Sequence, residues 1–366
     1  MKIGILKELK KGEKRVAITP KIVTSLVDKN FECLVEEDAG IEAQFKNSDY
    51  ENAGAIIKNR KEIFDTSDIL VKINPFEKEE IQMLHKDQIT ISQLFHLSNT
   101  GNIEELATKE ISAFSLDAMP RISRAQDMDV LSSQNNLAGY KSVILGANEL
   151  TKIFPLMMTA AGTITPSRVL IFGVGVAGLQ AIATAKRLGA VVEATDIRME
   201  TKEQTESLGA KFITVKNEED QGNTVYAKEA SDEYKQKQKE AVEESLFKAD
   251  LVITTAQVPG RKAPVLITKE QVEKMKNGAV LVDLAAEQGG NCEYSKIDET
   301  VMVNGVKIIG TSMSPVSVST NASELFGKNI YNFLIHLTNE NGFKWELDEE
   351  ITEGTLIIHN GKIKKK

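Results

Sequence analysis

The feature that most constrains the fold is the glycine-rich segment Gly173-Val174-Gly175-Val176-Ala177-Gly178. It follows an apolar run, RVLIFG (168–173), typical of a buried strand, and opens a helical pattern over 177–188 that ends at Gly189. In such a strand–turn–helix unit, one glycine makes the tight turn, the next admits a pyrophosphate, and the last lets helix and strand pack closely. The spacing predicts a dinucleotide-binding Rossmann domain, although the pattern alone also occurs in ordinary glycine-rich turns.

A carboxylate at the end of the following strand supports this interpretation. Asp196 ends the run VVEATD (191–196), where it can accept hydrogen bonds from ribose hydroxyls and would repel a 2′-phosphate. The sequence therefore favours NAD over NADP, while Arg198 keeps NADP from being excluded. The helix N-terminus would hold the pyrophosphate, because its N–H groups lack partners. The expected nucleotide-binding residues are Gly173, Gly175, Val176, Ala177, Gly178, Asp196, Ile197, Arg198, Thr255 and Ala256.

Strand-like and helical segments alternate along the whole chain. This predicts an α/β fold, with two Rossmann-like domains whose mostly parallel sheets flank a cleft and are linked by long helices. Strands are expected at 2–8, 31–37, 68–73, 89–95, 111–117, 168–173, 191–196, 211–215, 251–256, 279–285 and 307–312. We expect an N-terminal α/β domain over 1–135, completed by 320–366, and a Rossmann NAD(H)-binding domain over 136–319.

Three segments between and after these strands carry further expectations. Apolar residues keep a helical spacing from 128 to about 158, with Gly139 and Gly146 where chains pack closely. The C-terminal hairpin, with Asn360-Gly361 at its turn, should return to the first domain, because the Rossmann sheet needs no further strand. The polar stretch 216–226 is expected to be a long exposed loop of the kind that serves as a lid or partner contact.

Composition excludes several classes of function. The formal net charge of −8 argues against a nucleic-acid or anionic-lipid partner. The two cysteines and four histidines show no spacing for a disulfide framework or a metal, so we expect no metal site. The chain starts on a strand-like run and not on a secretory leader, and no apolar run reaches the ~20 residues of a membrane span. These features predict a soluble, cytoplasmic chain.

The segment PRISRAQDMDVLSSQNNLAGY (120–140) is more specific than any fold argument. It resembles the loop that binds the dihydronicotinamide end of NADH in the NAD(H)-binding subunits of proton-translocating nicotinamide nucleotide transhydrogenases. The resemblance covers nearly the whole chain and is closest from 120 to 292. The signature KRVAITP (14–20) is shared with alanine dehydrogenase, which belongs to the same superfamily.

The resemblance assigns roles to particular residues. A set that we name the nicotinamide-proximal set would hold the reactive end of the nucleotide, with Gln126 bridging toward it and Asp129 and Ser132 holding the carboxamide. Its members are Arg121, Gln126, Asp129 and Ser132. Tyr226 would belong to a mobile loop that closes over the nucleotide. The alternative is that Arg121, Asp129 and Ser132 form an ordinary solvated helix start and that Tyr226 rests on the surface.

The same resemblance implies a reaction and partners. Hydride would pass directly from NADH to NADP⁺, which a separate NADP(H)-binding subunit holds, and membrane-spanning subunits would couple the transfer to proton movement. A homodimer is implied as well. The assembled chain would lie peripherally on the cytoplasmic face of the inner membrane.

Two other functions remain open at this stage. In alanine dehydrogenase, residues equivalent to Arg15 and Lys72 hold the substrate, and a histidine matching His96 carries the proton that oxidative deamination releases. That constellation predicts a stand-alone amino-acid dehydrogenase, unless His96 is a strand-end histidine satisfied by the backbone. A non-catalytic NAD-binding module on the same fold is the third possibility.

Overall fold

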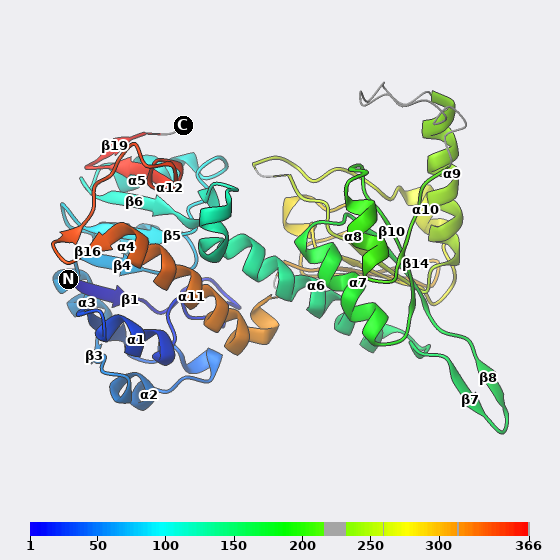
Figure 1. The fold of residues 1–366 in the computed structure, drawn as a ribbon, viewed down its shortest axis with the longest axis horizontal. Coiled ribbons are helices and arrows are strands. Elements are labelled where there is room, and N and C mark those ends of the chain that lie inside the picture. Colours follow the sequence, from blue (N-terminus) through cyan, green and yellow to red (C-terminus); the bar gives the residue numbers. More distant parts are fainter. Residues whose placement is uncertain (216–231, 259, 313–314, 365–366) are drawn as a thin grey trace. The chain divides into compact units, whose positions relative to one another are not determined.

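The computed structural model describes residues 1–215, 232–258, 260–312 and 315–364. The chain divides into two compact units, which we name the first unit (Met1–Gln134 with Pro315–Lys366) and the second unit (Asn135–Ser314) (Figure 1). Within the described residues, each unit is built on one large, mostly parallel sheet with helices packed on it. The predicted α/β class is confirmed.

The sheet of the first unit has the strand order β19-β18-β6-β5-β4-β1-β2-β3. The strands from β6 to β3 run parallel, and the chain reverses its direction across the sheet between β1 and β4. This is the doubly wound arrangement, and β1 and β4 flank its topological switch point. The strands are β1 (Lys2–Ile5), β2 (Glu32–Glu36), β3 (Ile56–Lys58), β4 (Ile69–Val71), β5 (Ile89–Ser92), β6 (Ser112–Ser115), β18 (Leu356–His359) and β19 (Lys362–Ile363).

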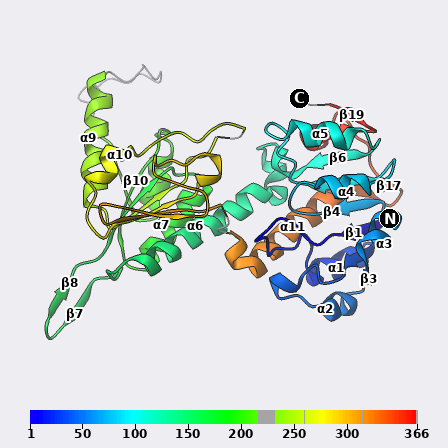
Figure 2. The ribbon, with the colours of Figure 1, turned by 180° about the vertical axis from the view of Figure 1, so that it is seen from behind.

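Helices cover both faces of this sheet (Figures 1 and 2). Apolar residues of α1 and α11 pack on one face, and those of α3, α4 and α5 pack on the other. The helical elements are α1 (Pro20–Val27), η1 (Ile41–Ala43), α2 (Asn47–Asn52), α3 (Arg60–Thr66), α4 (Lys78–Gln82), α5 (Thr100–Ala107), η2 (Leu116–Ala118), η3 (Ser123–Met128), η5 (Pro315–Val318), α11 (Ser319–Leu337) and α12 (Glu350–Thr355).

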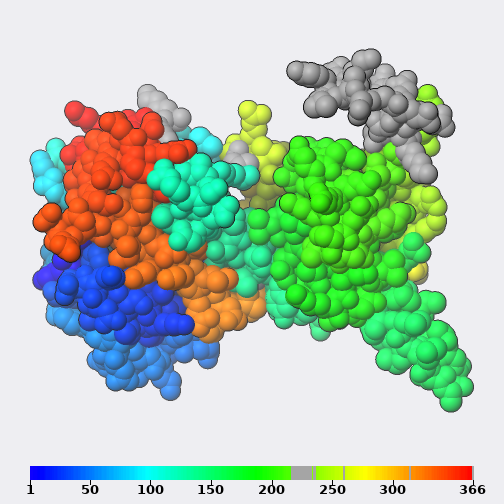
Figure 3. Space-filling view, viewed as in Figure 1, coloured from blue at the N-terminus to red at the C-terminus, as the bar shows by residue number. Residues whose placement is uncertain are grey.

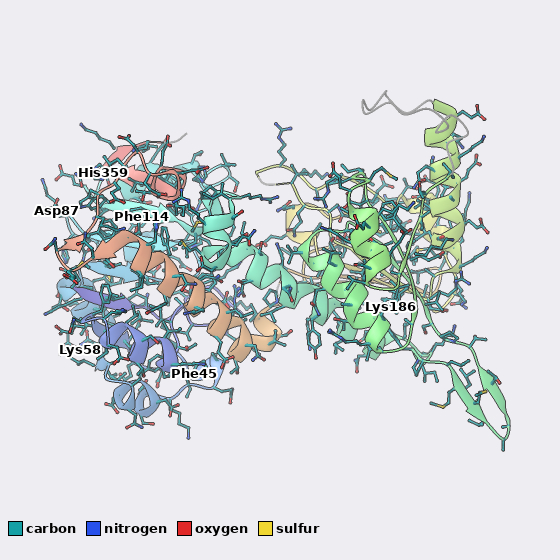
Figure 4. All side chains as sticks on the ribbon, viewed as in Figure 1. Phe45, Lys58, Asp87, Phe114, Lys186 and His359 are labelled. Carbon is teal, nitrogen blue, oxygen red and sulfur yellow. The ribbon has the colours of Figure 1, made fainter. Side chains whose placement is uncertain are left out.

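The C-terminal segment completes the first unit, as the sequence predicted. Strand β18 pairs antiparallel with β6, and β19 folds back on β18 through a turn at Asn360 and Gly361, both with positive φ. After a small hairpin of β16 (Thr338–Asn339) and β17 (Gly342–Phe343), Trp345 packs against His359, with ring centroids 4.7 Å apart. His359 and Phe114 are labelled in Figure 4. Phe114 of β6 lies 6.4 Å from the same indole, so aromatic contacts attach the tail to the sheet.

The sheet of the second unit has the order β11-β10-β9-β12-β13-β15-β14, with its switch point between β9 and β12. All its pairs are parallel except β14 with β15. The strands are β9 (Arg168–Phe172), β10 (Val191–Thr195), β11 (Lys211–Phe212), β12 (Leu251–Thr254), β13 (Val280–Asp283), β14 (Thr300–Val303) and β15 (Val306–Gly310), and the helical elements are α7 (Val176–Arg187), α8 (Thr201–Ser207), α9 (Asp232–Lys248), α10 (Lys269–Glu273) and η4 (Ala286–Gln288). In both units, every strand that the sequence predicted is present, and each is shorter than predicted.

Helix α6 (Val130–Glu149) begins in the first unit and ends in the second. The close packing predicted at its two glycines is confirmed, because a Cβ at Gly139 would lie 2.1 Å from the Ala177 carbonyl oxygen. A Cβ at Gly146 would lie 2.4 Å from the Leu251 side chain.

The expectation that the helical pattern runs to about residue 158 is wrong. The helix ends at Glu149. Pro155 would in any case prevent one helix from continuing to residue 158, because proline disfavours helical geometry at the residue before it. The apolar residues that follow form a hairpin of β7 (Met157–Thr159) and β8 (Gly162–Ile164), which projects from the surface of its unit (Figure 3). The loop predicted over 216–226 lies outside the described residues. Within the described residues, none of the helices has the length and apolarity needed to cross a bilayer.

Asp250, between α9 and β12, accepts side-chain hydrogen bonds from three other segments of the second unit. Its side chain is buried and accepts hydrogen bonds from the Lys152 ammonium at 2.8 Å and the Arg168 backbone N–H at 2.9 Å. Lys276 Nζ donates to its other oxygen. Burial raises the pKa of Asp250, but the bonds from Lys152, Lys276 and Arg168 outweigh it, so the pKa lies below its ordinary value of 3.8.

We predict that Asp250→Asn destabilises the chain by about 1–3 kcal/mol at neutral pH, because an amide cannot replace a charge-assisted acceptor. A carboxylate with a lowered pKa stabilises the fold above its unfolded pKa, and this contribution is lost as pH falls through the folded value. Chemical denaturation should therefore show a constant difference in the free energy of unfolding between wild type and variant from pH 7 to about pH 5. This difference should be smaller below about pH 4. A stability difference that grows as the pH falls would contradict a stabilising role for the ionised Asp250.

Candidate functional site

The glycine-rich turn lies at the carboxyl end of β9, at the switch point of the second unit. Gly173 has φ +89°, and a Cβ there would lie 2.6 Å from Thr255 Oγ1. At Gly178 a Cβ would lie 1.9 Å from the Gly173 carbonyl oxygen, so only glycine lets α7 pack this closely on β9. The packing of the chain itself therefore requires glycine at both positions.

Gly175 differs from its two neighbours. Its φ is −85°, which any residue adopts, and nothing lies within 4 Å of the place where its Cβ would be. Gly175 is also the N-cap of α7, so no side chain satisfies the first N–H groups of that helix. The result is open space beside backbone donors at the positive end of a helix, which fits a phosphate group.

Asp196 follows β10 and is joined to the glycine turn. Its Oδ2 accepts from the Val174 N–H at 2.7 Å, and Arg198 donates to both oxygens through Nε and Nη2 at 3.0 Å each. Burial raises the pKa of Asp196, but hydrogen bonds from Arg198 and Val174 outweigh it and lower the pKa below its ordinary value. The carboxylate is ionised at neutral pH, and a ribose hydroxyl would compete with the Arg198 guanidinium for it.

Apolar side chains stand in solvent beside this carboxylate. Ile197 is 98% exposed and Met199 is 51% exposed. A large apolar side chain left in water next to a polar anchor suits the face of a flat ring such as adenine.

Thr255 and Ala256 follow β12 on the other side of the switch point. The Thr255 hydroxyl donates to the Gly173 carbonyl at 3.0 Å, so its role in this structure is to hold the glycine turn. Ala256 is held by the buried Asn291 side chain, which accepts from the Ala256 N–H at 3.0 Å and donates to its carbonyl at 2.9 Å. The segment after β12 is thus fixed by the chain's own polar groups.

Sequence reasoning missed Asn291 and its partner Asp283, both fully buried. Asp283 accepts from the backbone N–H of Asn291 at 2.7 Å and of Cys292 at 3.1 Å, and from the Ser295 hydroxyl. The signal that could have revealed Asp283 is a charged residue at the end of the otherwise apolar strand β13, because a buried carboxylate needs several donors.

The nicotinamide-proximal set lies in the first unit, around the start of α6. Asp129 immediately precedes the helix and accepts from the Ser132 backbone N–H at 3.0 Å and from its hydroxyl at 2.5 Å. The structure therefore brings Asp129 and Ser132 together as a helix cap, which leaves lone pairs of both side chains available to further donors. Arg121 and Gln126 lie exposed just before them, and Tyr226 lies outside the described residues.

The residues expected for an amino-acid dehydrogenase are arranged differently. Lys72 is 1% exposed, with its ammonium 2.6 Å from Glu80 Oε2 and 5.3 Å from the centre of the Phe76 ring. The Arg15 guanidinium is bound to Glu13 at 2.7 Å. His96 lies partly buried in the turn after β5. Lys72 is thus enclosed by the chain's own side chains and is not open to a substrate.

Known proteins resemble this chain over its full length. The family model "Alanine dehydrogenase/PNT, N-terminal domain" matches residues 4–138, and "Alanine dehydrogenase/PNT, C-terminal domain" matches residues 142–366. The first of the parts that make up NAD(P) transhydrogenase subunit alpha in Rhodospirillum rubrum is 48% identical, with 99% of this chain and 97% of that protein aligned. An alanine dehydrogenase of Halomonas elongata is 29% identical over 99% and 94% of the two chains. The crystal structure of transhydrogenase from Sinorhizobium meliloti matches with a TM-score of 0.91 and 40% identity, covering 99% of this chain and 100% of that one.

The contrast between two glycines of the turn gives a prediction. Gly175→Ala should fold with an unchanged Tm but bind NADH roughly tenfold or more weakly, a loss of about 1.4 kcal/mol or more, because its methyl group meets only the ligand. Gly178→Ala should lower the stability itself by about 1–3 kcal/mol or more, because its methyl group meets the Gly173 carbonyl. Thermal denaturation and NADH titration of both variants would check this. Native NADH affinity in Gly175→Ala would show that no phosphate lies at this backbone.

Proposed function

We propose that this chain, which belongs to the alanine dehydrogenase/PNT family, is the NAD(H)-binding component of a proton-translocating NAD(P) transhydrogenase. Its task is to hold NADH so that hydride passes directly to NADP⁺ on a partner subunit. The observation that favours this function over that of an amino-acid dehydrogenase is the buried Lys72–Glu80 ion pair. The Lys72 side chain is 1% exposed and its ammonium is paired with Glu80, so a substrate carbonyl could reach it only by displacing the side chains that cover it.

In this proposal, the second unit binds the pyrophosphate and the adenosine part of the nucleotide. The N-terminus of α7 and the backbone at Gly175 would receive the pyrophosphate, because the donors there face open space. Asp196 would accept from the ribose hydroxyls, and Ile197 would cover one face of the adenine. The ionised Asp196 repels a 2′-phosphate, so this chain takes NAD(H) and leaves NADP(H) to its partner.

The first unit supplies the orientation of the reactive ring. NADH, when bound, contributes the hydride from its dihydronicotinamide. Asp129 and Ser132 would accept hydrogen bonds from the carboxamide N–H groups with the lone pairs that their mutual bond leaves available. Arg121 and Gln126 would contact the nucleotide from the preceding exposed segment, and Tyr226 would help to exclude water. Fixed orientation in a dry site is what direct hydride transfer requires.

The proposal includes an assembly. The name of the Rhodospirillum rubrum relative makes it one of several parts of a subunit alpha, which implies that it works with further chains. For this chain we infer a homodimer, an NADP(H)-binding subunit and membrane-spanning subunits that couple hydride transfer to proton movement. The assembled chain would lie on the cytoplasmic face of the inner membrane.

Activity assays separate this function from that of a dehydrogenase. Alone, the purified chain should not reduce NAD⁺ with L-alanine, because Lys72 is paired within the fold. Mixed with an NADP(H)-binding transhydrogenase component, it should catalyse exchange between NADH and the 3-acetylpyridine analogue of NAD⁺, followed by absorbance.

His96→Ala is the matched control for this assay. It should leave the exchange within about twofold of wild type, because hydride exchange needs no proton carrier. Turnover with L-alanine that disappears in His96→Ala would establish the dehydrogenase instead.

A further inference from the structure

The switch point of the first unit is filled by its own polar side chains. Glu8 comes after β1, and Asn74 comes after β4, so both lie at the carboxyl ends of the strands that flank this point. Glu8 accepts from the Ile73 backbone N–H at 2.5 Å and from Asn74 Nδ2 at 3.0 Å. Doubly wound sheets commonly bind ligands here, but in this unit a carboxylate of the chain occupies the backbone donor.

The hydrogen bonds continue from Asn74 to a buried ion pair. Asn74 Nδ2 also donates to Glu13 at 3.0 Å, and Glu13 in turn accepts from Arg15 Nε at 2.8 Å and Nη2 at 2.7 Å. The Glu13 side chain is 1% exposed and that of Arg15 is 11% exposed. A bidentate pair with this geometry fixes the plane of the guanidinium as well as its position.

Arg15 connects this pair to the helix that carries Asp129 and Ser132. Its remaining terminal nitrogen, Nη1, donates to Gln134 Oε1 at 2.8 Å. The Gln134 side chain, 6% exposed on α6, donates from Nε2 to the Ala322 carbonyl of α11 at 3.0 Å. The start of α6 is thereby held between Arg15 on one side and α11 on the other. We name Glu8, Asn74, Glu13, Arg15 and Gln134 the switch-point network.

We propose that Arg15 and Gln134 are positioning residues for hydride transfer, which fix the start of α6 and with it the cap that would hold the carboxamide. This inference rests on the proposed function. Gln134 lies two residues after Ser132 in the first turns of one rigid helix, so a shift at Gln134 moves the Asp129–Ser132 cap by a similar amount. A misplacement of about 1 Å can cost on the order of a hundredfold in rate.

The network also explains why Arg15 is present without an amino-acid substrate. Three of its nitrogens are bound to Glu13 and Gln134, both buried acceptors of the same unit. Lysine could not replace it, because an ammonium lacks the planar fork that bridges two acceptors at fixed angles.

The test compares two buried glutamines of the first unit. Gln134→Met removes the link to Arg15 and α11. Gln88→Met is the control, since Gln88 is 7% exposed and donates to the Phe64 and Ser67 carbonyls at 2.7 and 2.9 Å, away from α6. Both variants should lower the Tm to a similar extent. Only Gln134→Met should lower kcat of the NADH exchange, by roughly tenfold or more, with the Kd for NADH within about threefold, because the second unit supplies most of the affinity.

A second set of variants keeps the test decisive if Gln134→Met folds poorly. Arg15→Lys retains the charge beside Glu13 and should fold. It should nevertheless lower kcat of the NADH exchange as Gln134→Met does. The double variant should be no slower than the slower single variant, because both changes break one connection. Equal kcat in Gln134→Met and Gln88→Met, or additive losses in the double variant, would overturn the positioning role.

Asp129→Asn separates this inference from the proposed function. If Asp129→Asn lowers the exchange while Arg15→Lys and Gln134→Met leave it unchanged, the proposed function stands and the positioning role is overturned. If the unmodified chain shows no exchange with the NADP(H)-binding component, the proposed function itself fails, and the inference fails with it.

Discussion

Both halves of the molecule depend on the same geometric constraint, the parallel crossover that brings the carboxyl ends of neighbouring strands together at a switch point. In the second unit this place is left open, because Gly175 adds no side chain and the N-terminus of α7 is uncapped. In the first unit the same place is closed by Glu8 and Asn74. The same fold therefore leaves open space at the switch point of one unit and fills that of the other with its own side chains.

The distribution of charge follows this division. Backbone donors face open space at Gly175, where they attract an anion, and the nearby Asp196 remains ionised because Arg198 and Val174 stabilise its charge. In the first unit, the cations that an organic acid would need are used internally, since Lys72 is bound to Glu80 and Arg15 to Glu13. For the proposed transhydrogenase component, this means that backbone donors of the second unit stay open to a nucleotide, while Lys72 and Arg15 of the first unit are paired within the fold.

Local patterns in the sequence predicted what local forces determine. The α/β class, the Rossmann strands, the return of the C-terminal hairpin and the family resemblance are all confirmed, because they rest on periodicity, glycine spacing and contiguous motifs. The short strands β3 and β14 were missed because a few residues at a sheet edge show no periodicity. The apolar residues near Met157 satisfied a helical spacing, but only tertiary structure shows that they form a hairpin. The contact between Arg15 and Gln134 joins residues far apart in the chain, and no pattern in a single sequence reports such a pair. The roles of the nicotinamide-proximal set stay predictions.

The most direct measurement of the central claim follows the hydride itself. The chain would be combined with an NADP(H)-binding transhydrogenase component, NADP⁺ and NADH that carries deuterium at both C4 positions, in ordinary water. Direct transfer between two held nicotinamides predicts that each NADPH formed carries one deuterium at C4, as mass spectrometry would show. NADPH with no deuterium at that carbon would contradict the account, because the transferred hydrogen would then have passed through a group that exchanges with solvent.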